Sequence, residues 1–165
     1  CRPPHGMHRR VIQRDWSNSL MSEFWQTKKL HEMSQQEWES LCDGCGKCCL
    51  VKLEDYETAE IYHTNLACKL LDINACRCTN YEGRQQQVDD CVKLDPQNLK
   101  SIKWLPDTCS YKLIEQGKPL PDWHYLITGE RDTVHQVLGS VRHFATTEVG
   151  VEEQDLEQHI IQWVD

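Results

Sequence analysis

The stretch LCDGCGKCCL, residues 41–50, constrains this chain more than any other feature, because it places four cysteines within eight residues. They are Cys42, Cys45, Cys48 and Cys49, so two of them are adjacent. A disulfide staple, a metal site, a redox centre or simple packing could each account for such a cluster. The choice matters for the fold as well as the function, since any cross-link restricts the chain around it.

Composition predicts one small domain that a cross-link would help to stabilise. The chain has 165 residues, which favours a single domain. Hydrophobic residues make up 39% of it, below the ~45–50% of ordinary globular proteins. We therefore expect a thin apolar core in a small, irregular, mainly helical α+β domain. A short β-hairpin and a cysteine-ligated metal site complete this expected fold.

The first 20 residues differ in composition from the rest. They are basic but lack the apolar run of a secretory signal, and MSEFWQTKKL from Met21 resembles a natural start. We predict a disordered extension over 1–20 and one cysteine-rich domain over 21–165, and Cys1 is left out of any site. No apolar run reaches the ~20 residues that cross a bilayer. A cytoplasmic protein with reduced thiols is therefore expected.

Spacing also argues against disulfides as the reason for the cluster. Cysteines only two residues apart close loops too short to remove much entropy from the unfolded chain. A metal site, a redox centre or simple packing remains.

The distribution of charge argues against two classes of partner. The chain carries a net charge of −8, and residues 1–20 carry +3, so the remainder carries −11. Nucleic acid and anionic membrane surfaces both require clustered Lys and Arg. The sequence therefore predicts neither nucleic acid nor a membrane as a partner. The cysteines predict a metal ion as a partner, and no feature identifies a protein partner.

The glycines around the first cysteines are typical of a metal knuckle. A C-x-x-C pair lets two thiolates reach one tetrahedral ion from a single tight loop. Such a loop needs residues with positive φ, and Gly44 and Gly46 flank Cys45. Cys48 extends the pattern to C-x-x-C-x-x-C. A redox C-x-x-C would normally begin a helix in a βαβ unit, whereas this one follows a predicted helix.

The adjacent pair Cys48–Cys49 is harder to interpret. Neighbouring side chains diverge by ~100° in a helix and ~180° in a strand, so both reach one ion only with difficulty. Either one is a ligand and the other packs, or the two serve different metals or opposite sides of a cluster.

Further cysteines downstream can complete a four-coordinate site. Cys68, Cys78 and Cys91 are the main candidates, and Cys76 and Cys109 are secondary ones. The histidines share no metal-ligand spacing, so we expect them to have structural or surface roles. This prediction covers His63, His124, His135 and His143.

Local signals predict several short elements. Ser34 and Glu37 form a capping box, so a helix follows Ser34, ends near Gly44 and carries Cys42 on its last turn. Residues 50–54 and 60–66 predict a hairpin that leaves the cysteine cluster and returns at Cys68.

Later signals predict two more helices, a loop and a helical tail. Pro96 begins a short helix, and a second helix runs from Pro106 to Gly117 with Cys109 on one face. Residues 118–129 are expected to be a loop. The tail from 151 predicts an amphipathic acidic helix with Leu156, Ile160 and Trp163 on its apolar face.

These motifs resemble a family of mostly bacterial proteins that is named for its C-x-x-C-x-x-C-C signature and described as zinc- or iron-chelating. CDGCGKCC carries the signature, CTNYEGR followed by a further cysteine resembles the family's second motif, and WESLCDGCG and WLPDTC are similar to the YcgN-like branch. Gln85 stands where the family commonly has proline. The resemblance implies metal binding through residues 42, 45, 48, 49, 68, 78 and 91. Tyr81 and Arg84 are then expected to lie near the sulfurs.

The sequence leaves the metal and its role open. Spacing alone suits Zn²⁺, mononuclear iron or an iron–sulfur cluster. Three hypotheses follow: a metal site that is structural or serves metal handling, an iron or iron–sulfur enzyme that modifies a peptide or small molecule, and an interaction module that uses the acidic tail helix.

Overall fold

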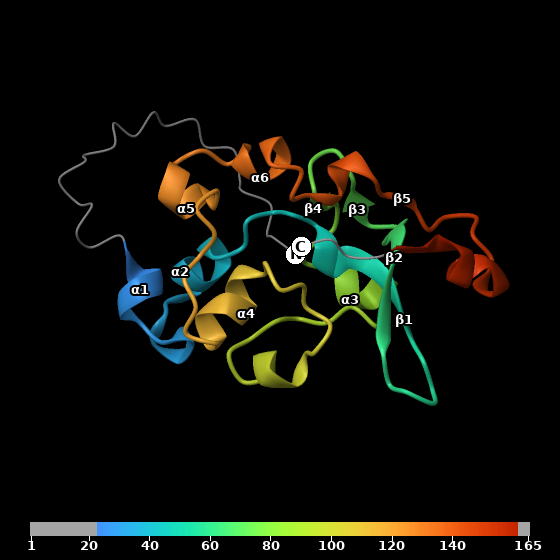
Figure 1. Ribbon diagram of the computed structural model, residues 1–165, viewed down its shortest axis with the longest axis horizontal. Coiled ribbons are helices and arrows are strands. Elements are labelled where there is room, and N and C mark those ends of the chain that lie inside the picture. The colour runs from blue at the N-terminus through green and yellow to red at the C-terminus, as the bar shows by residue number, and fades with distance from the viewer. Residues whose placement is uncertain (1–22, 162–165) are drawn as a thin grey trace.

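Short elements joined by long turns make up the part of the chain that the computed structural model describes, residues 23–161 (Figure 1). The α-helices are α1 (Phe24–Thr27), α2 (Gln35–Ser40), α3 (Arg84–Gln87), α4 (Ser110–Glu115), α5 (Tyr125–Thr128) and α6 (Thr133–Gln136). The 3₁₀ segments are η2 (Leu30–Glu32), η3 (Lys47–Cys49), η4 (Leu99–Ser101), η5 (Val141–His143) and η6 (Glu153–His159). The strands are β1 (Leu50–Glu54), β2 (Ile61–Ala67), β3 (Leu71–Asp72), β4 (Arg77–Cys78), β5 (Thr146–Thr147) and β6 (Ile160–Ile161).

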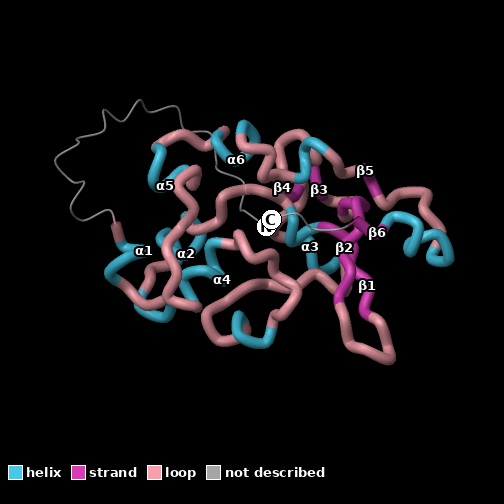
Figure 2. Tube along the Cα trace, viewed as in Figure 1, coloured by secondary structure: helices cyan, strands magenta, loops and turns pink. Residues whose placement is uncertain are grey.

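The mixture of helices and strands in one small domain confirms the α+β class, but the prediction of a mainly helical fold overstates the helix content. Helices account for 34% and strands for 14% of the described residues. Just over half of the described chain therefore lies in turns and loops, as Figure 2 shows. Each α-helix has only four to six residues, and helices this short depend on tertiary packing for their stability.

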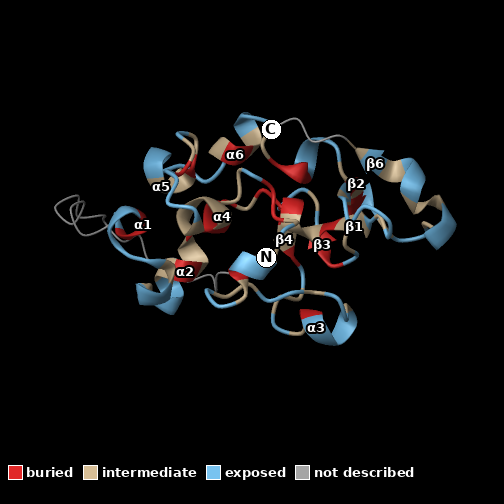
Figure 3. Ribbon diagram, turned by 60° about the horizontal axis from the view of Figure 1, so that its bottom comes forward, coloured by how far each residue is buried: buried red, intermediate tan, exposed pale blue. Residues whose placement is uncertain are grey.

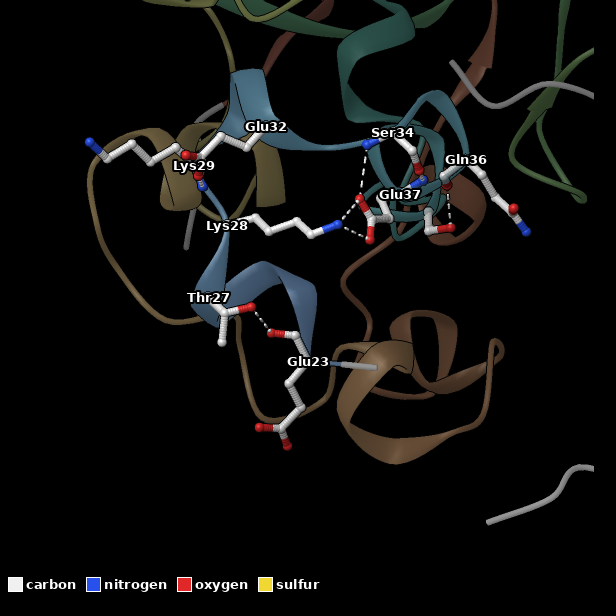
Figure 4. A network of polar contacts seen from close by, with 9 residues as sticks. Glu23, Thr27, Lys28, Lys29, Glu32, Ser34, Gln36 and Glu37 are labelled. Atoms are coloured by element: carbon white, nitrogen blue, oxygen red, sulfur yellow. Dashed lines mark hydrogen bonds and ion pairs between the residues drawn. The ribbon is translucent and has the colours of Figure 1, made fainter. Parts of the chain in front are cut away.

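The capping box at Ser34 is confirmed. The Ser34 hydroxyl accepts a hydrogen bond from the Glu37 N–H at 3.2 Å, and the Glu37 carboxylate accepts one from the Ser34 N–H at 2.8 Å (Figure 4). Lys28 adds an ion pair of 2.7 Å to the same carboxylate. The predicted end of the helix was wrong, because α2 stops at Ser40 with Leu41 as its C-cap. Cys42 therefore follows the helix instead of lying on its last turn.

Residues of α1, α2, α4 and η4, with neighbouring turn residues, form the first of two apolar cores. Helices α1, α2, α4 and α5 lie on one side of the molecule, whereas the strands and α3 lie toward the other (Figure 1). The buried members of this core are Phe24, Trp25, Trp38, Leu41, Leu99, Leu105, Tyr111 and Leu120. The second core lies beside the strands and contains Leu50, Ala67, Leu71, Cys76 and Val141. Two small cores instead of one large core fit the low apolar content of the chain.

The predicted hairpin is confirmed. Strands β1 and β2 pair antiparallel, with Glu54 opposite Ile61 and Leu50 opposite Ala67. The chain then returns to the cysteine cluster, because the Cys68 N–H donates to the Cys49 carbonyl at 2.9 Å. On its other edge β2 pairs in parallel with β5 and antiparallel with β6. Strands β3 and β4 form a separate two-stranded sheet.

The tail does not form the predicted amphipathic α-helix. It forms the 3₁₀ segment η6, which buries no residue (Figure 3), and then strand β6. The β-branched pair Ile160–Ile161 suits a strand, and these two residues pair with Thr64 and His63 on the edge of β2. Trp163 lies outside the described residues. The interaction-module hypothesis loses the helix on which it rested.

Three other predicted elements differ in detail. After Pro96 the chain forms a turn and then η4, because the Asp95 carboxylate accepts from the N–H groups of residues 97 and 98 and closes a tight turn. The next helix, α4, begins only at Ser110 with Cys109 as its N-cap, and it ends at Glu115. The left-handed Gly117 follows its C-cap, Gln116, and closes the helix as predicted. The predicted loop 118–129 contains α5, which His124 caps.

No helix within residues 23–161 is long and apolar enough to cross a bilayer. The predicted extension, residues 1–20, lies outside the described part of the chain.

We expect Ser34→Ala to lower the free energy of unfolding by about 1 kcal/mol, because the Glu37 N–H would lose its capping acceptor. Urea denaturation followed by circular dichroism measures this change. Ser40→Ala is the matched control in the same helix, since the Ser40 hydroxyl only returns to the Gln36 carbonyl and caps nothing. Equal losses from both variants would contradict the capping role.

Candidate metal centre

The loop that carries the first cysteines is built around an acidic side chain and two left-handed glycines. The Asp43 carboxylate accepts a hydrogen bond of 2.9 Å from the Cys45 N–H, which turns the chain back on itself. Gly44 and Gly46 have φ values of +78° and +76°, as a metal knuckle requires. The 3₁₀ segment η3 then carries Cys48 and Cys49 into β1.

Three side chains from later helices hold the start of this loop. The Trp38 carbonyl accepts from the Leu41 N–H at 3.1 Å, and the carbonyls after it lie at the helix end, where donors within the helix run out. The Tyr111 hydroxyl donates to the Trp38 carbonyl at 3.0 Å, and the Tyr125 hydroxyl donates to the Ser40 carbonyl. The fully buried His124 lies 3.0 Å from the Leu41 carbonyl. Residues from α4 and α5 thus position the chain that enters Cys42.

The tautomer of His124 follows from its two hydrogen bonds. Its Nδ1 accepts from the Leu126 N–H, so its Nε2 carries the proton that is donated to the Leu41 carbonyl. Sequence patterns offered no signal for this long-range role, although the expectation that His124 is structural agrees with it. The other histidines considered as ligands also make hydrogen bonds away from the cysteines. These are His63 to the Trp104 carbonyl, His135 to Ser140, and His143 to the His135 carbonyl.

A small cavity of about 30 Å³ lies beneath the knuckle. It exceeds the ~10–15 Å³ that one water molecule needs, so it is of a size to hold one ion. The cysteines that line it are Cys42, Cys45, Cys48, Cys49, Cys76, Cys78 and Cys109.

A second cavity of about 400 Å³ adjoins the first and falls within the size range of small-molecule sites. The cysteines that line it are Cys48, Cys49, Cys68, Cys78 and Cys91. It also has charged walls, which come from Lys52, Glu54, Arg84, Asp90 and Glu148. Every cysteine in the described part of the chain lines one or both cavities, and all of them are free thiols.

The thiols line shared cavities without converging on one point. Within residues 23–161, no three Cys, His, Asp or Glu side chains are grouped closely enough to hold a metal ion. The Cys48 and Cys49 sulfurs are 3.9 Å apart. The predicted organisation around an assembled metal site is therefore not seen, and a metal would have to draw the thiols inward.

Unpartnered polar atoms support a missing ligand in the smaller cavity. The Asp43 Oδ2 and Ser110 Oγ atoms are buried without a hydrogen-bond partner, and both residues line this cavity. A buried carboxylate oxygen in this condition is costly unless a cation or donor lies nearby. Thiols are soft ligands that suit zinc or iron. The donor set and the unpartnered oxygens therefore fit a metal ion.

Burial dominates the electrostatics of the thiols. It raises the pKa of Cys42 and Cys45, and it raises the pKa of Cys109 to about 12. The adjacent pair behaves as a unit: hydrogen bonding from the Cys49 thiol holds the pKa of Cys48 well below its usual value and raises that of Cys49. One thiolate is thus stabilised within the pair.

Cys76 differs from the other cysteines. It sits at a φ of +50° before β4, and its thiol donates to the Ile73 carbonyl at 3.3 Å. It is a buried member of the second core. This arrangement is typical of a packing thiol.

Tyr81 and Arg84 contact each other at the edge of the larger cavity. The guanidinium carbon of Arg84 lies 3.9 Å from the centre of the Tyr81 ring, and its Nη1 donates to the Tyr81 carbonyl. Arg84 is buried and lines the cavity. It therefore places a positive charge in a wall shared with thiols.

Sequence analysis missed Lys52. Its ammonium group donates to the carbonyls of Cys48 and Leu50 and lies 4.4 Å from the centre of a Trp104 ring. Burial lowers the pKa of Lys52, and the nearby charges of Cys48 and Cys49 raise it. A lysine that follows the cysteine pair by three residues on a predicted strand was the available signal.

Comparison with known proteins adds a family. A family model named CxxCxxCC and described as "Putative zinc- or iron-chelating domain" matches residues 41–110, the span that contains every described cysteine. A UPF0260 protein of Marinobacter nauticus is 53% identical over 141 residues, which cover 86% of this chain and 95% of that protein. This chain belongs to the UPF0260 family.

Other UPF0260 members show the same extent of similarity. The protein of Proteus mirabilis is 56% identical over 138 residues, covering 84% of this chain and 92% of its own length. That of Cellvibrio japonicus is 53% identical over 141 residues, covering 86% and 96%. No solved structure matches this UPF0260 chain significantly. The resemblance noted from the cysteine motifs is thereby confirmed.

The glycines of the UPF0260 knuckle differ in the space around them. A Cβ atom at Gly46 would lie 2.7 Å from the Val141 Cγ2, whereas a Cβ at Gly44 would meet nothing within 4 Å. Both residues have positive φ, so alanine costs roughly 1–2 kcal/mol of backbone strain at either position. We expect Gly46→Ala to lower the free energy of unfolding by roughly 1–3 kcal/mol more than Gly44→Ala does.

Urea denaturation of the two variants measures this difference directly. Gly44→Ala serves as the control for backbone strain without a clash. Equal losses would show that the packing of Gly46 against Val141 contributes nothing.

Proposed function

We propose that this chain is a cytoplasmic metal-binding protein that chelates zinc or iron through the thiolates of its two cysteine-lined cavities. The observation that carries this proposal is that cysteines from distant parts of the chain all line two adjoining cavities. Packing alone does not require thiols to gather in this way. The family model's description as zinc- or iron-chelating supports the same conclusion.

The ligands come from three segments of the chain. The knuckle supplies Cys42, Cys45, Cys48 and Cys49, the segment after the hairpin supplies Cys68, Cys78 and Cys91, and the N-cap of α4 supplies Cys109. Drawing these segments together would link the two small cores. Metal binding therefore contributes folding free energy in this proposal.

A second function is favoured by the larger cavity. Its volume of about 400 Å³ would admit a small molecule or part of a peptide beside the thiols. Lys52 and Arg84 would then bind acidic groups of such a substrate, and an iron or iron–sulfur centre would supply redox or Lewis-acid chemistry. This candidate requires an iron centre, so the identity of the metal separates the two functions.

Elemental analysis and an absorption spectrum of anaerobically purified protein test the proposal. We expect zinc or iron at one or more equivalents per chain, with visible thiolate-to-iron absorption only if the metal is iron. Colourless protein with stoichiometric zinc would remove the enzyme candidate.

Removing the metal with a chelator should lower the helical circular dichroism and the midpoint of thermal unfolding, because the two cores lose their link. Two results together would refute metal binding. The protein would contain no metal after purification or after reconstitution, and a chelator would leave its circular dichroism spectrum unchanged.

Zinc affinity should increase with pH. Burial raises the pKa of most ligand thiols, that of Cys109 to about 12, so these groups hold protons at neutral pH and must release them to bind metal. Each proton released makes the affinity roughly tenfold higher per pH unit. Competition with a chromophoric chelator at pH 6 and pH 8, corrected for the chelator's own protonation, measures the slope. An affinity independent of pH would contradict thiol ligation.

A further inference from the structure

The adjacent cysteines 48 and 49 belong to different packing environments. Cys48 packs against the first core together with Cys42 and Cys109, whereas Cys49 packs against the second core. Their backbone lies in the 3₁₀ segment η3, where consecutive side chains diverge by ~120°. The pair therefore stands between the two cores with one thiol toward each.

The remaining cysteines divide in the same way between the two cavities. Cys42, Cys45 and Cys109 line only the smaller cavity, and Cys68 and Cys91 line only the larger one. Cys48, Cys49 and Cys78 lie on the wall that the cavities share.

Backbone pairing places Cys78 with the second set. Cys78 in β4 lies opposite Leu71 in β3. The Leu71 N–H donates to the Cys68 carbonyl at 2.8 Å, so the strand pair holds Cys78 beside the segment that carries Cys68.

We propose that the cysteines form two adjoining four-thiolate metal centres, one of Cys42, Cys45, Cys48 and Cys109 and one of Cys49, Cys68, Cys78 and Cys91. Four thiolates are the number that a closed tetrahedral zinc site or an iron–sulfur cluster requires. This inference rests on the proposed function and assigns its ligands and its number of centres.

The ninth described cysteine is accounted for as well. Cys76 donates its thiol to the Ile73 carbonyl and is a buried part of the second core, so it belongs to neither set. It therefore provides a matched control for the loss of a buried thiol.

Lys52 is placed to offset the charge of both sets. Its ammonium group donates to the carbonyls of Cys48 and Leu50, and the residue lines the larger cavity together with Cys49 and Cys68. Two four-thiolate centres side by side carry net negative charge, which a nearby buried cation stabilises. Lys52 thus places one positive charge between the two proposed centres.

Zinc titration of reduced, metal-free protein under anaerobic conditions tests this proposal. Native mass spectrometry counts the bound ions, and a competing chromophoric chelator gives the affinities. We expect two zinc ions per wild-type chain. Cys109→Ser and Cys91→Ser should each retain one ion, the double variant should bind none tightly, and Cys76→Ser should retain two.

The outcomes separate this inference from the function on which it rests. A wild-type chain that never exceeds one zinc ion overturns the two-centre proposal and leaves metal binding intact. A wild-type chain that binds no zinc overturns both. The wild-type count needs no variant, so the test holds even if a cysteine variant fails to fold. Retention of two ions by both Cys109→Ser and Cys91→Ser would also overturn the assignment.

Discussion

The anchoring of the cysteine loop on both sides is the constraint on which the rest of the structure depends. The Val141 N–H donates to the Cys45 carbonyl at 2.8 Å, and the Cys68 N–H donates to the Cys49 carbonyl at 2.9 Å. Gly46 fits against Val141 only because it has no side chain. These contacts join the loop to segments about 20 and about 95 residues further along the chain, and they bring thiols from separate regions to the same cavities.

A chain with few apolar residues has divided its hydrophobic burial between two cores that meet at these thiols. Buried polar groups gather at the same place, including Asp43, Ser110 and Arg84. Such groups weaken a junction unless something pairs with them. Stability and function therefore converge in the proposed metal centres, because the ions that would occupy the cavities would also offset this cost and link the cores.

Elements that depend on nearby residues formed as their sequence patterns predicted. Where strands from distant parts of the chain pair, that pairing replaced the element that the local pattern predicted. The capping box at Ser34 depends on residues three apart, and the hairpin depends on a short turn, so the sequence predicted both. The tail shows the opposite case. Leu156 and Ile160 have helical spacing, but the open edge of β2 pairs with Ile160 and Ile161. Similarly, no local pattern indicates that α5 presents His124 to the Leu41 carbonyl.

The sequence by itself determined the kind of site: a glycine-flanked C-x-x-C-x-x-C-C loop, further cysteines downstream, and the chemistry of thiolate ligands. Only the tertiary structure decided how those thiols are grouped. In the folded chain Cys109 lines the same cavity as the first cysteines, and Cys76 is buried in the second core. Cys48 packs against the first core and Cys49 against the second. Residue types and spacing encode what can bind a metal. The direction of each side chain depends on packing and hydrogen bonds between distant segments, which no local pattern contains.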